Sequence, residues 1–267
     1  MPVTQNKIWV TGIFLFSKED LLNRILTLAI LGLVFAATAV SEGARQKPEP
    51  STKNAPTVDQ VIDRYIKAVG GTAAIEKITT RVMRGSLVTS GGTARLEVYE
   101  KTPNKFLVIV ENSAAGLSQN GFNGVVAWSQ NAQRGSREMK GPEVENFKRE
   151  YDLHREIKLK EFYPKMSVTG RETIGDRDAF VVEAATVDGV SEVLYFDVGT
   201  GLLFRRDVTV QGTTLQAYLE DYREVDGIKI PFTIRRSRPD FSFTYKFDEV
   251  KHNIAVEDSK FNKPAPQ

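Results

Sequence analysis

The chain contains no cysteine and only two histidines among its 267 residues. The absence of cysteine excludes disulfides, thiolate zinc sites, covalently attached haem, a cysteine nucleophile and a lipid-modified N-terminal cysteine. The nucleophile elbow G-x-S-x-G, the dinucleotide fingerprint G-x-G-x-x-G, the P-loop and the zinc motif H-E-x-x-H are also missing. The sequence therefore predicts a protein without catalytic residues, without a metal site and without a cofactor.

The two histidines and one pair of aspartates could in principle bind a metal, and their sequence positions favour structural roles. His154 falls in a charged helical segment and His252 follows the last strand, and no carboxylate is spaced to complete a metal set with them. We therefore expect both histidines to be exposed to solvent. Asp176 and Asp178 flank a turn, and turn chemistry accounts for them better than calcium because no full ligand loop follows.

Long apolar runs are also missing. The longest uncharged apolar stretch, residues 25–40, follows Arg24 and is shorter than the roughly 20 residues of a membrane span. Ala37-Thr38-Ala39 supplies a small-x-small cleavage pattern, so residues 1–39 are predicted to be a signal peptide, the alternative being an uncleaved anchor. Glu19 and Asp20 are unusual before such a segment and suggest a misassigned start codon. The mature protein is expected to be exported, cleaved and not lipidated.

Strong net charge is missing as well. The formal charge is +2, which does not steer a protein of this size to nucleic acid. Residues 40–56 are polar and rich in proline, and they are predicted to be a flexible linker. No internal boundary follows, so residues 57–264 are predicted to form a single domain.

Helical periodicity is confined to three segments. Apolar residues recur at helical spacing over residues 58–69, with Thr57 as N-cap and Gly70 as the stop. A short helix is predicted from the N-cap Thr72 to about Ile78. Residues 141–164 are dense in charge, and they are predicted to form one amphipathic helix that ends before Pro164.

The rest of the chain has the two-residue period of strands. Strands are predicted over 80–89, 94–101, 105–111, 124–130, 180–184, 191–197, 202–210, 213–222, 228–234 and 241–248. Tight turns join many of them, which requires antiparallel neighbours. A sheet this wide curls when it is strongly twisted. The predicted fold class is α+β: a strongly curved antiparallel sheet, an open half-barrel of about nine to eleven strands, with about two or three helices on its concave face.

Several stretches, in this order, resemble the periplasmic family of the lipoprotein carrier LolA. They are AVGGTAAIEKITTRVMRG, the Asn123-Gly124 turn before Trp128, YFDVGTGLLFRRDV, DYREVDGIKIPFTIR and FDEVKHNIAVEDSKFNKP, and they cover most of residues 58–264. The resemblance implies an open half-barrel with helices on its concave side. It also implies a hollow that binds lipid acyl chains, and a periplasmic location.

The candidate ligand-binding residues are those expected on apolar strand faces that line this hollow. They are Leu96, Val98, Phe106, Val108, Val126, Trp128, Phe180, Val182, Phe204 and Arg206. Arg206 is expected to share a face with Phe204 and Val208 and to meet an acidic head group, or else to lie at a solvated strand end. Trp128 is expected to face the apolar interior, the alternative being that it is ordinary core.

The function expected from these observations is non-catalytic binding or transport of lipid acyl chains or acylated lipoproteins by a monomer. The alternative is a structural module of the cell envelope, with a filled core, that docks to a protein partner. Residues 141–164 contain few apolar anchors among many charges, so we expect this segment, rather than the first helix, to open the hollow.

Overall fold

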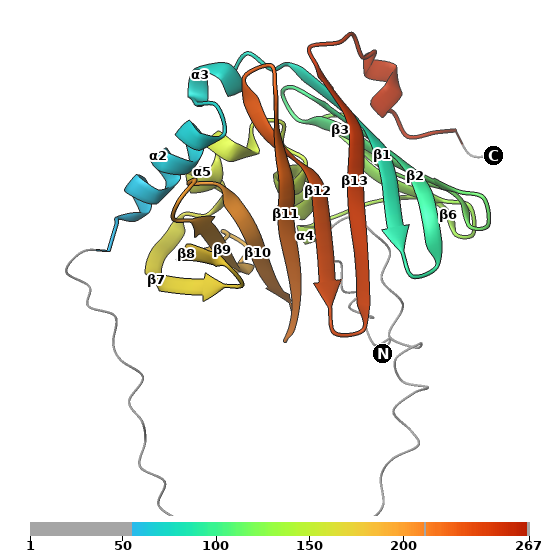
Figure 1. The fold of residues 1–267 in the computed structure, drawn as a ribbon. Helices are drawn as coiled ribbons and strands as arrows, with labels where there is room; N and C mark the ends of the chain where they lie inside the picture. The colour runs from blue at the N-terminus through green and yellow to red at the C-terminus, as the bar shows by residue number, and fades with distance from the viewer. Residues whose placement is uncertain (1–54, 211, 266–267) are drawn as a thin grey trace, which may run out of the picture. The chain divides into compact units, whose positions relative to one another are not determined.

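The computed structural model describes residues 55–210 and 212–265. The predicted signal peptide and most of the predicted linker lie outside the described residues. The described chain builds one antiparallel sheet of thirteen strands in the order β6-β5-β4-β3-β2-β1-β13-β12-β11-β10-β9-β8-β7. Strand β1 pairs with β13, so the first and last strands along the chain lie side by side in the middle of the sheet (Figure 1).

The thirteen strands exceed the predicted nine to eleven. The strands are β1 (Thr80–Thr89), β2 (Gly92–Lys101), β3 (Lys105–Asn112), β4 (Gly116–Phe122), β5 (Ala127–Asn131), β6 (Gly135–Glu138), β7 (Lys165–Ile174), β8 (Arg177–Ala185), β9 (Ser191–Asp197), β10 (Leu203–Val210), β11 (Thr213–Val225), β12 (Ile228–Arg238) and β13 (Phe241–His252). The three that the sequence did not reveal are β4, β6 and β7. Strands β6 and β7 are the two edges of the sheet and remain largely exposed, so they carry little apolar alternation.

Helix α2 (Val58–Ala68) forms as predicted. It packs beside the turn between β9 and β10, where Arg64 donates to the carbonyl oxygens of Val198 and Gly199. The Thr57 hydroxyl accepts the Gln60 backbone N–H, and the Gln60 side chain accepts the Thr57 N–H, which completes a capping box. Gly70 has φ +128°, and a Cβ there would lie 2.3 Å from the Gly227 carbonyl oxygen. A glycine is therefore required at this helix stop. The short helix α3 (Thr72–Ile75) also forms, but its N-cap is Gly71 rather than Thr72.

The segment 141–164 is not one helix. It forms α4 (Pro142–Glu150), a 3-10 turn η2 (Arg155–Ile157) and α5 (Leu159–Phe162). The break follows from Asp152, whose carboxylate accepts the His154 backbone N–H at 2.8 Å and the Lys158 ammonium at 2.8 Å. Such a local side-chain turn competes with helical hydrogen bonds. Helical periodicity alone did not reveal this interruption.

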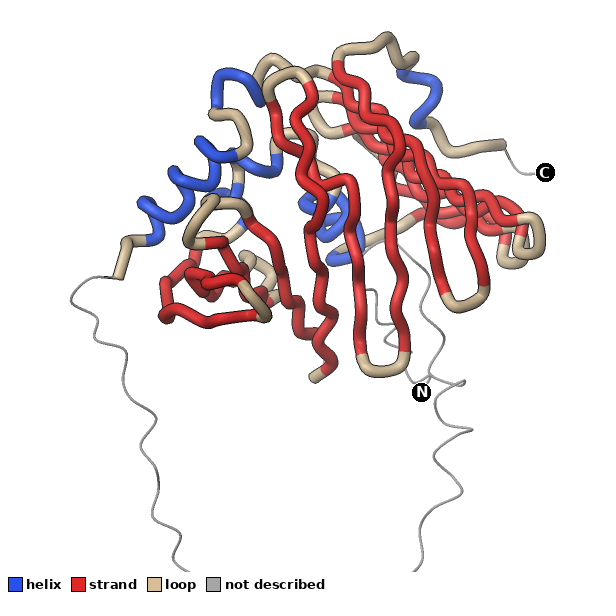
Figure 2. Tube along the Cα trace, viewed as in Figure 1, coloured by secondary structure: helices blue, strands red, loops and turns tan. Residues whose placement is uncertain are grey.

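The sheet bends around α4, which places this helix on the concave face. Phe147 of α4 stacks on Phe106 of β3 with ring centroids 5.6 Å apart, while Glu150 reaches Arg206 of β10 at 3.2 Å. Strands β3 and β10 are six places apart in the sheet, about 29 Å if it were flat. Residues 147 and 150 are only about 4.5 Å apart along the helix axis. Both contacts are possible only in a strongly curved sheet, as Figure 2 shows, and the sheet is not closed because β6 and β7 at its two edges do not pair with each other.

The convex face is covered at one flank by the end of the chain, residues 253–265, which includes the 3-10 turn η3 (Asp258–Phe261). Figure 1 shows this C-terminal segment outside β1–β3 and α4 behind β11 and β12, on the inner side of the bend. Strands β2–β5 are therefore covered on both faces, by α4 inside and by the C-terminal segment outside. Double coverage explains the continuous apolar run of β3.

Candidate functional site

Seven of the ten predicted ligand-binding residues lie on the concave face, in two groups on opposite flanks. One group consists of Leu96, Val98, Phe106 and Val108 on β2 and β3, and the other of Phe180, Val182 and Arg206 on β8 and β10. All seven side chains are buried. Helix α4 packs on the β2–β3 group through Phe147, whereas α2 packs on the other flank, where Tyr65 contacts Phe196 of β9 with ring centroids 5.4 Å apart. Val126 lies half-buried in the turn between β4 and β5.

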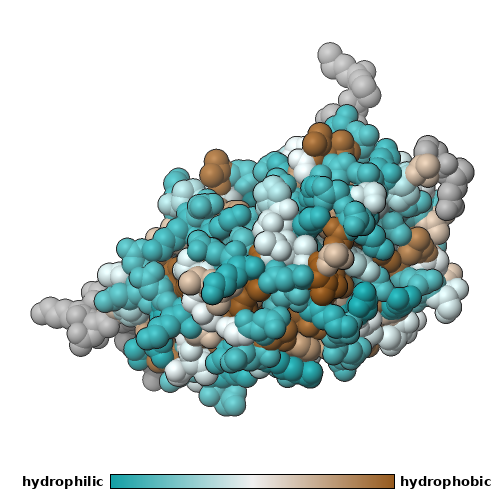
Figure 3. All heavy atoms as spheres, turned by 90° about the horizontal axis from the view of Figure 1, so that it is seen from above, coloured by the Kyte–Doolittle hydropathy of each residue, from teal (hydrophilic) through white to brown (hydrophobic). Residues whose placement is uncertain are grey.

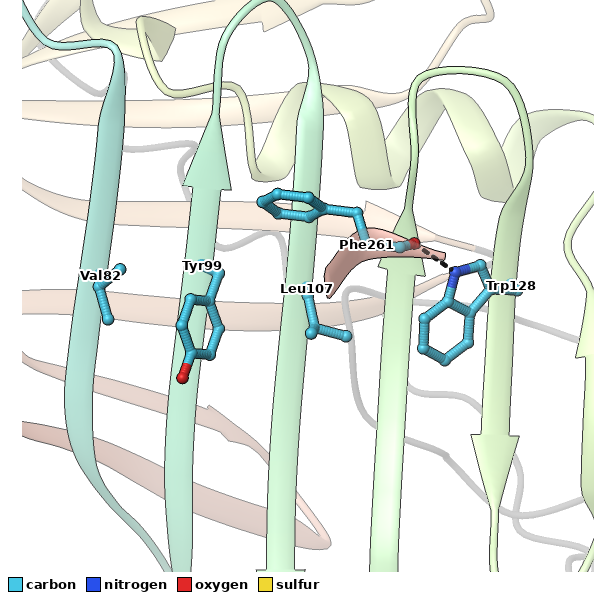
Figure 4. Packing of buried hydrophobic residues seen from close by; sticks show 5 residues of the cluster. All are labelled: Val82, Tyr99, Leu107, Trp128 and Phe261. Atoms are coloured by element: carbon cyan, nitrogen blue, oxygen red, sulfur yellow. Dashed lines mark hydrogen bonds between the residues drawn. The ribbon is translucent and has the colours of Figure 1, made fainter. Parts of the chain in front are cut away.

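Trp128 lies on the opposite, convex face. It is fully buried in a cluster with Val82, Tyr99, Leu107 and Phe261, and its indole N–H donates to the Phe261 carbonyl oxygen at 2.9 Å (Figure 4). The neighbouring Ala127 packs on the concave side with Phe106 and Phe147, as strand alternation requires. Trp128 is therefore a core residue under the C-terminal segment rather than part of the interior that faces α4.

The Trp128 ring also explains why residue 121, which pairs with Trp128 between β4 and β5, is a glycine. A Cβ at position 121 would lie 2.6 Å from the Trp128 ring, so the ring lies directly over the glycine backbone. The Asn123-Gly124 turn that follows brings β5 back beside β4, with the Asn123 side chain accepting two backbone N–H groups of the turn. The short polar β4 thus serves as the platform on which Trp128 packs.

Phe204 and Arg206 do not share a face, contrary to the prediction from alternation. The pairing of β10 with β9 shifts register between Leu203 and Arg205, which is a β-bulge. Phe204 consequently joins a convex cluster with Val181 and Tyr195. Arg206 points to the concave side and is only 7% exposed, so it is not at a solvated strand end.

Arg206 belongs to a buried cluster of four charges. Its guanidinium donates to the Glu192 carboxylate at 2.9 Å and to the Glu150 carboxylate at 3.2 Å. The other oxygen of Glu150 accepts from Arg236 of β12. The four side chains are each 9% exposed or less. One helix residue thereby ties α4 to two strands of the sheet.

The charges of this cluster are locked in their ionised forms. Burial alone would raise the pKa of Glu150, but Arg236 and Arg206 together hold it far below its ordinary value. The pKa of Glu192 is lowered in the same way, chiefly by Arg206 against the effect of burial. Burial would lower the pKa of Arg206, yet Glu192 and Glu150 raise it well above the usual range. Fully paired ions of this kind are costly to separate.

A second buried group lies where β1 meets β2 and β13. Arg81 pairs with Glu100 at 3.2 Å and donates from Nε to the His252 Nε2 at 3.2 Å. Because a guanidinium only donates, His252 must carry its proton on Nδ1, which lies 3.1 Å from the Asp226 carboxylate. Burial and Arg81 lower the pKa of His252, which favours its neutral form. Burial raises the pKa of Glu100 to about 7 despite Arg81.

Neither histidine is exposed, so that prediction was wrong. His252 is buried because its pairing with Arg81 places it at the junction between the first and last strands. His154 is half-buried, with its Nε2 2.8 Å from the Ile78 carbonyl oxygen. Both rings have structural partners.

A shallow pocket of about 180 Å³ lies on the convex face, lined by Arg95, Glu97, Ile109 and Glu111. The Arg95 guanidinium contacts Glu97 and also Glu111, the latter at 3.7 Å. Three of its four lining residues are charged, so the pocket does not suit an acyl chain.

Comparison with solved structures identifies the fold. The structure resembles a LolA superfamily protein from Nitrosomonas europaea with a TM-score of 0.55 at 13% identity, covering 78% of this chain and 99% of that one. The chain has the LolA-like fold. A DUF1329 family protein from Desulfovibrio piger gives a TM-score of 0.56 at 14% identity, covering 77% of this chain and 97% of that one. A domain named for outer membrane lipoprotein sorting, from Vibrio parahaemolyticus, gives 0.55 at 14% identity, covering 76% and 97%.

These likenesses confirm the resemblance predicted from the sequence at the level of fold. No family model matches the LolA-like chain, and no curated protein matches it significantly. None of the helices between residues 55 and 265 combines the length and hydropathy that a membrane crossing requires. Within the same described range, no three histidine or acidic side chains are grouped to hold a metal ion.

Three of the four buried charges in this LolA-like fold were not predicted as site residues, namely Glu150, Glu192 and Arg236. The signal available was the pair of adjacent arginines on each of two strands, Arg205-Arg206 and Arg235-Arg236. One arginine of each pair points outward over the Tyr218 ring, and the other points inward to Glu150. Alternation predicts that split, but the carboxylate that joins the inward pair comes from a distant helix.

Seen from the upper end of Figure 1, the surface is mostly hydrophilic, with hydrophobic atoms in several separate patches (Figure 3).

Proposed function

We propose that this chain is a non-catalytic, exported periplasmic protein that binds lipid acyl chains or acylated lipoproteins between the sheet and α4. The observation that carries the proposal is the way the concave face is covered. Apolar side chains of both flanks are buried on the concave face, where α4 covers the β2–β3 flank and α2 packs on the other flank through Tyr65 and Phe196. Helix α4 is followed by non-helical residues at 151–154. Displacing α4 exposes an apolar trough along β2, β3 and β13, and such a trough is the kind of surface that an acyl chain requires.

The aromatic side chains of this trough support the same conclusion. Phe241, Phe243, Tyr245 and Phe247 form a ladder along β13, with successive centroids 5.2–6.4 Å apart. Tyr151 at the end of α4 stacks on Phe106 at 5.0 Å. The hollow therefore has an apolar wall along its middle strand as well as on both flanks.

The test is whether purified protein contains or takes up lipid. Organic extracts of native protein are analysed by mass spectrometry, and uptake is measured with a dansyl-labelled long-chain fatty acid. Dansylglycine, which carries the same fluorophore without an acyl chain, is the control. A lipid in the extract, or enhancement with the long chain alone, supports the proposal. Lipid-free protein that also fails to bind the long-chain probe would refute it.

A second candidate function is a protein-docking module of the cell envelope with a filled core. It is favoured by the buried ion cluster that holds α4 in place and by the stacking of Phe147 and Tyr151 on Phe106. Purification from envelope extract that yields a stoichiometric protein partner and no lipid would favour this function over the first.

A further inference from the structure

The buried charges divide unequally between the sheet and the helix. Arg206, Arg236 and Glu192 belong to strands β10, β12 and β9, whereas Glu150 belongs to α4. In this cluster the sheet thus contributes two guanidinium groups and one carboxylate, a net charge of +1. The helix supplies the remaining negative charge. Any ligand that takes the place of α4 must meet this excess positive charge in a buried setting, where an uncompensated ion is strongly disfavoured.

The Glu150 carboxylate bridges the two arginines. Its Oε2 lies 3.2 Å from Nη1 of Arg206, and its Oε1 accepts from Nη2 of Arg236. One oxygen for each guanidinium is an arrangement that a free carboxylate or a phosphate group can reproduce. The Arg236 guanidinium also lies 5.8 Å from the Tyr245 ring centroid, so the polar point adjoins the aromatic ladder of β13.

The position of Glu150 in α4 is unfavourable for the stability of that helix. It is the last residue of α4, where the helix dipole disfavours negative charge. Local helix stability therefore does not explain this glutamate, and only its partners on the sheet do. Local conflicts of this kind, resolved by tertiary contacts, are typical of functional positions.

We propose that Arg206 and Arg236 form a binding site for the acidic head group of an amphiphile, and that Glu150 occupies this site in the unliganded protein. The inference rests on the proposed lipid-binding function and narrows its ligand class to lipids with an accessible carboxylate or phosphate. When such a ligand enters, its acyl chain lies along the apolar trough and its head group replaces the Glu150 carboxylate, which leaves with α4.

The experiment measures displacement of a bound dansyl-undecanoic acid probe from the full chain. Dodecanoate and dodecyl phosphate are the acidic competitors, and methyl dodecanoate is the neutral one of equal length. Titrations use the wild type, Glu150→Gln and the matched control Glu145→Gln. Glu145 lies on the same helix but is exposed and pairs with Lys148 at 3.0 Å, so its replacement leaves the arginine site intact.

In the wild type, at least one acid should compete roughly tenfold better than the ester, a difference of about 1.4 kcal/mol, because only the acid makes charge-assisted hydrogen bonds to the two guanidinium groups. Glu150→Gln removes the internal competitor, so it should increase the factor by which the acid competes better than the ester. Glu145→Gln should leave this factor unchanged. The two acidic competitors distinguish carboxylate from phosphate head groups.

Equal competition by acid and ester in the wild type would overturn the inference while leaving lipid binding intact. Failure of the probe to bind at all would overturn the proposed function and this inference together. If Glu150→Gln does not give a cooperative thermal transition, the comparison of acid with ester in the wild type decides the question by itself.

Discussion

Replacing Phe261 with alanine is expected to release the C-terminal segment from the convex face. Among residues 253–265, Phe261 is the one residue classed as buried, and its side chain is fully enclosed by the Trp128 cluster. The segment's other apolar residues, Ile254 and Val256, are only half-buried. Phe261 is therefore the main apolar anchor of the segment, which is also held by ion pairs of Asp258 with Lys101 and Lys105 at 2.8 and 2.6 Å.

The size of the effect follows from the contacts. Truncating a buried phenylalanine to alanine costs about 3–5 kcal/mol when the surrounding structure cannot relax. Here the segment can detach, so the loss is limited to its own docking free energy, roughly 3 kcal/mol from burial of the ring and the indole hydrogen bond. The acceptor of that bond is the Phe261 backbone carbonyl, which the substitution retains. The bond is therefore lost only if the segment leaves.

Tryptophan fluorescence distinguishes the two cases. The chain has two tryptophans, so the measurement is made in a Trp9→Phe background where Trp128 is the sole indole. Phe261→Ala should shift the emission of Trp128 to the red and increase its quenching by acrylamide, together with a lower urea midpoint. Val125→Ala, at an 86% exposed position near Trp128, is the control and should change neither. Unchanged emission and quenching in Phe261→Ala would refute the placement of the indole under this segment.

Three further results are expected. Gly121→Ala should lower the free energy of unfolding by about 1–3 kcal/mol, because the new Cβ meets the Trp128 ring, whereas Gly91→Ala should have little effect; equal urea midpoints would contradict this. Against the effect of burial, two arginines depress the folded-state pKa of Glu150 below 4.5, so this carboxylate stabilises the fold above about pH 4.5 and its contribution is lost as the pH falls. Glu150→Gln should therefore flatten the acid limb of the stability profile, and a limb as steep as that of Glu145→Gln would count against the pairing. Amide exchange should be faster across α4, η2 and α5 than across α2, with the difference shrinking when lipid binds; equal protection in the lipid-free protein would show that this segment is not a lid.

Elements whose signals are local could be predicted from the sequence. Helix α2 was evident from its apolar spacing, its capping threonine and its glycine stop, and the structure confirms all three. The hairpins across Gly91-Gly92, Asp188-Gly189 and Asp226-Gly227 were evident from turn residues. Edge strands β6 and β7 could not be predicted in the same way, because a strand that buries little carries little hydrophobic pattern.

The candidate site was predictable in part. Alternation placed Leu96, Val98, Phe106 and Val108 correctly on one face of β2 and β3. It could not tell which face of β5 is concave, because the C-terminal segment makes the convex face of this flank apolar too. Trp128 was therefore assigned to the wrong side of the sheet.

By itself, the sequence determined the features that depend on residues near one another along the chain. These are the antiparallel class of the sheet, most strands, the first helix and the opposite directions of adjacent arginines. Tertiary structure alone decided the β-bulge that separates Phe204 from Arg206, the break after Glu150, and the meeting of Glu150 with Arg206 and Arg236. The physical reason is that these features arise where a curved sheet brings distant strands to one helix. The free energy of burying and pairing the charges of Glu150, Arg206 and Arg236 depends on that meeting, and no local sequence pattern encodes it.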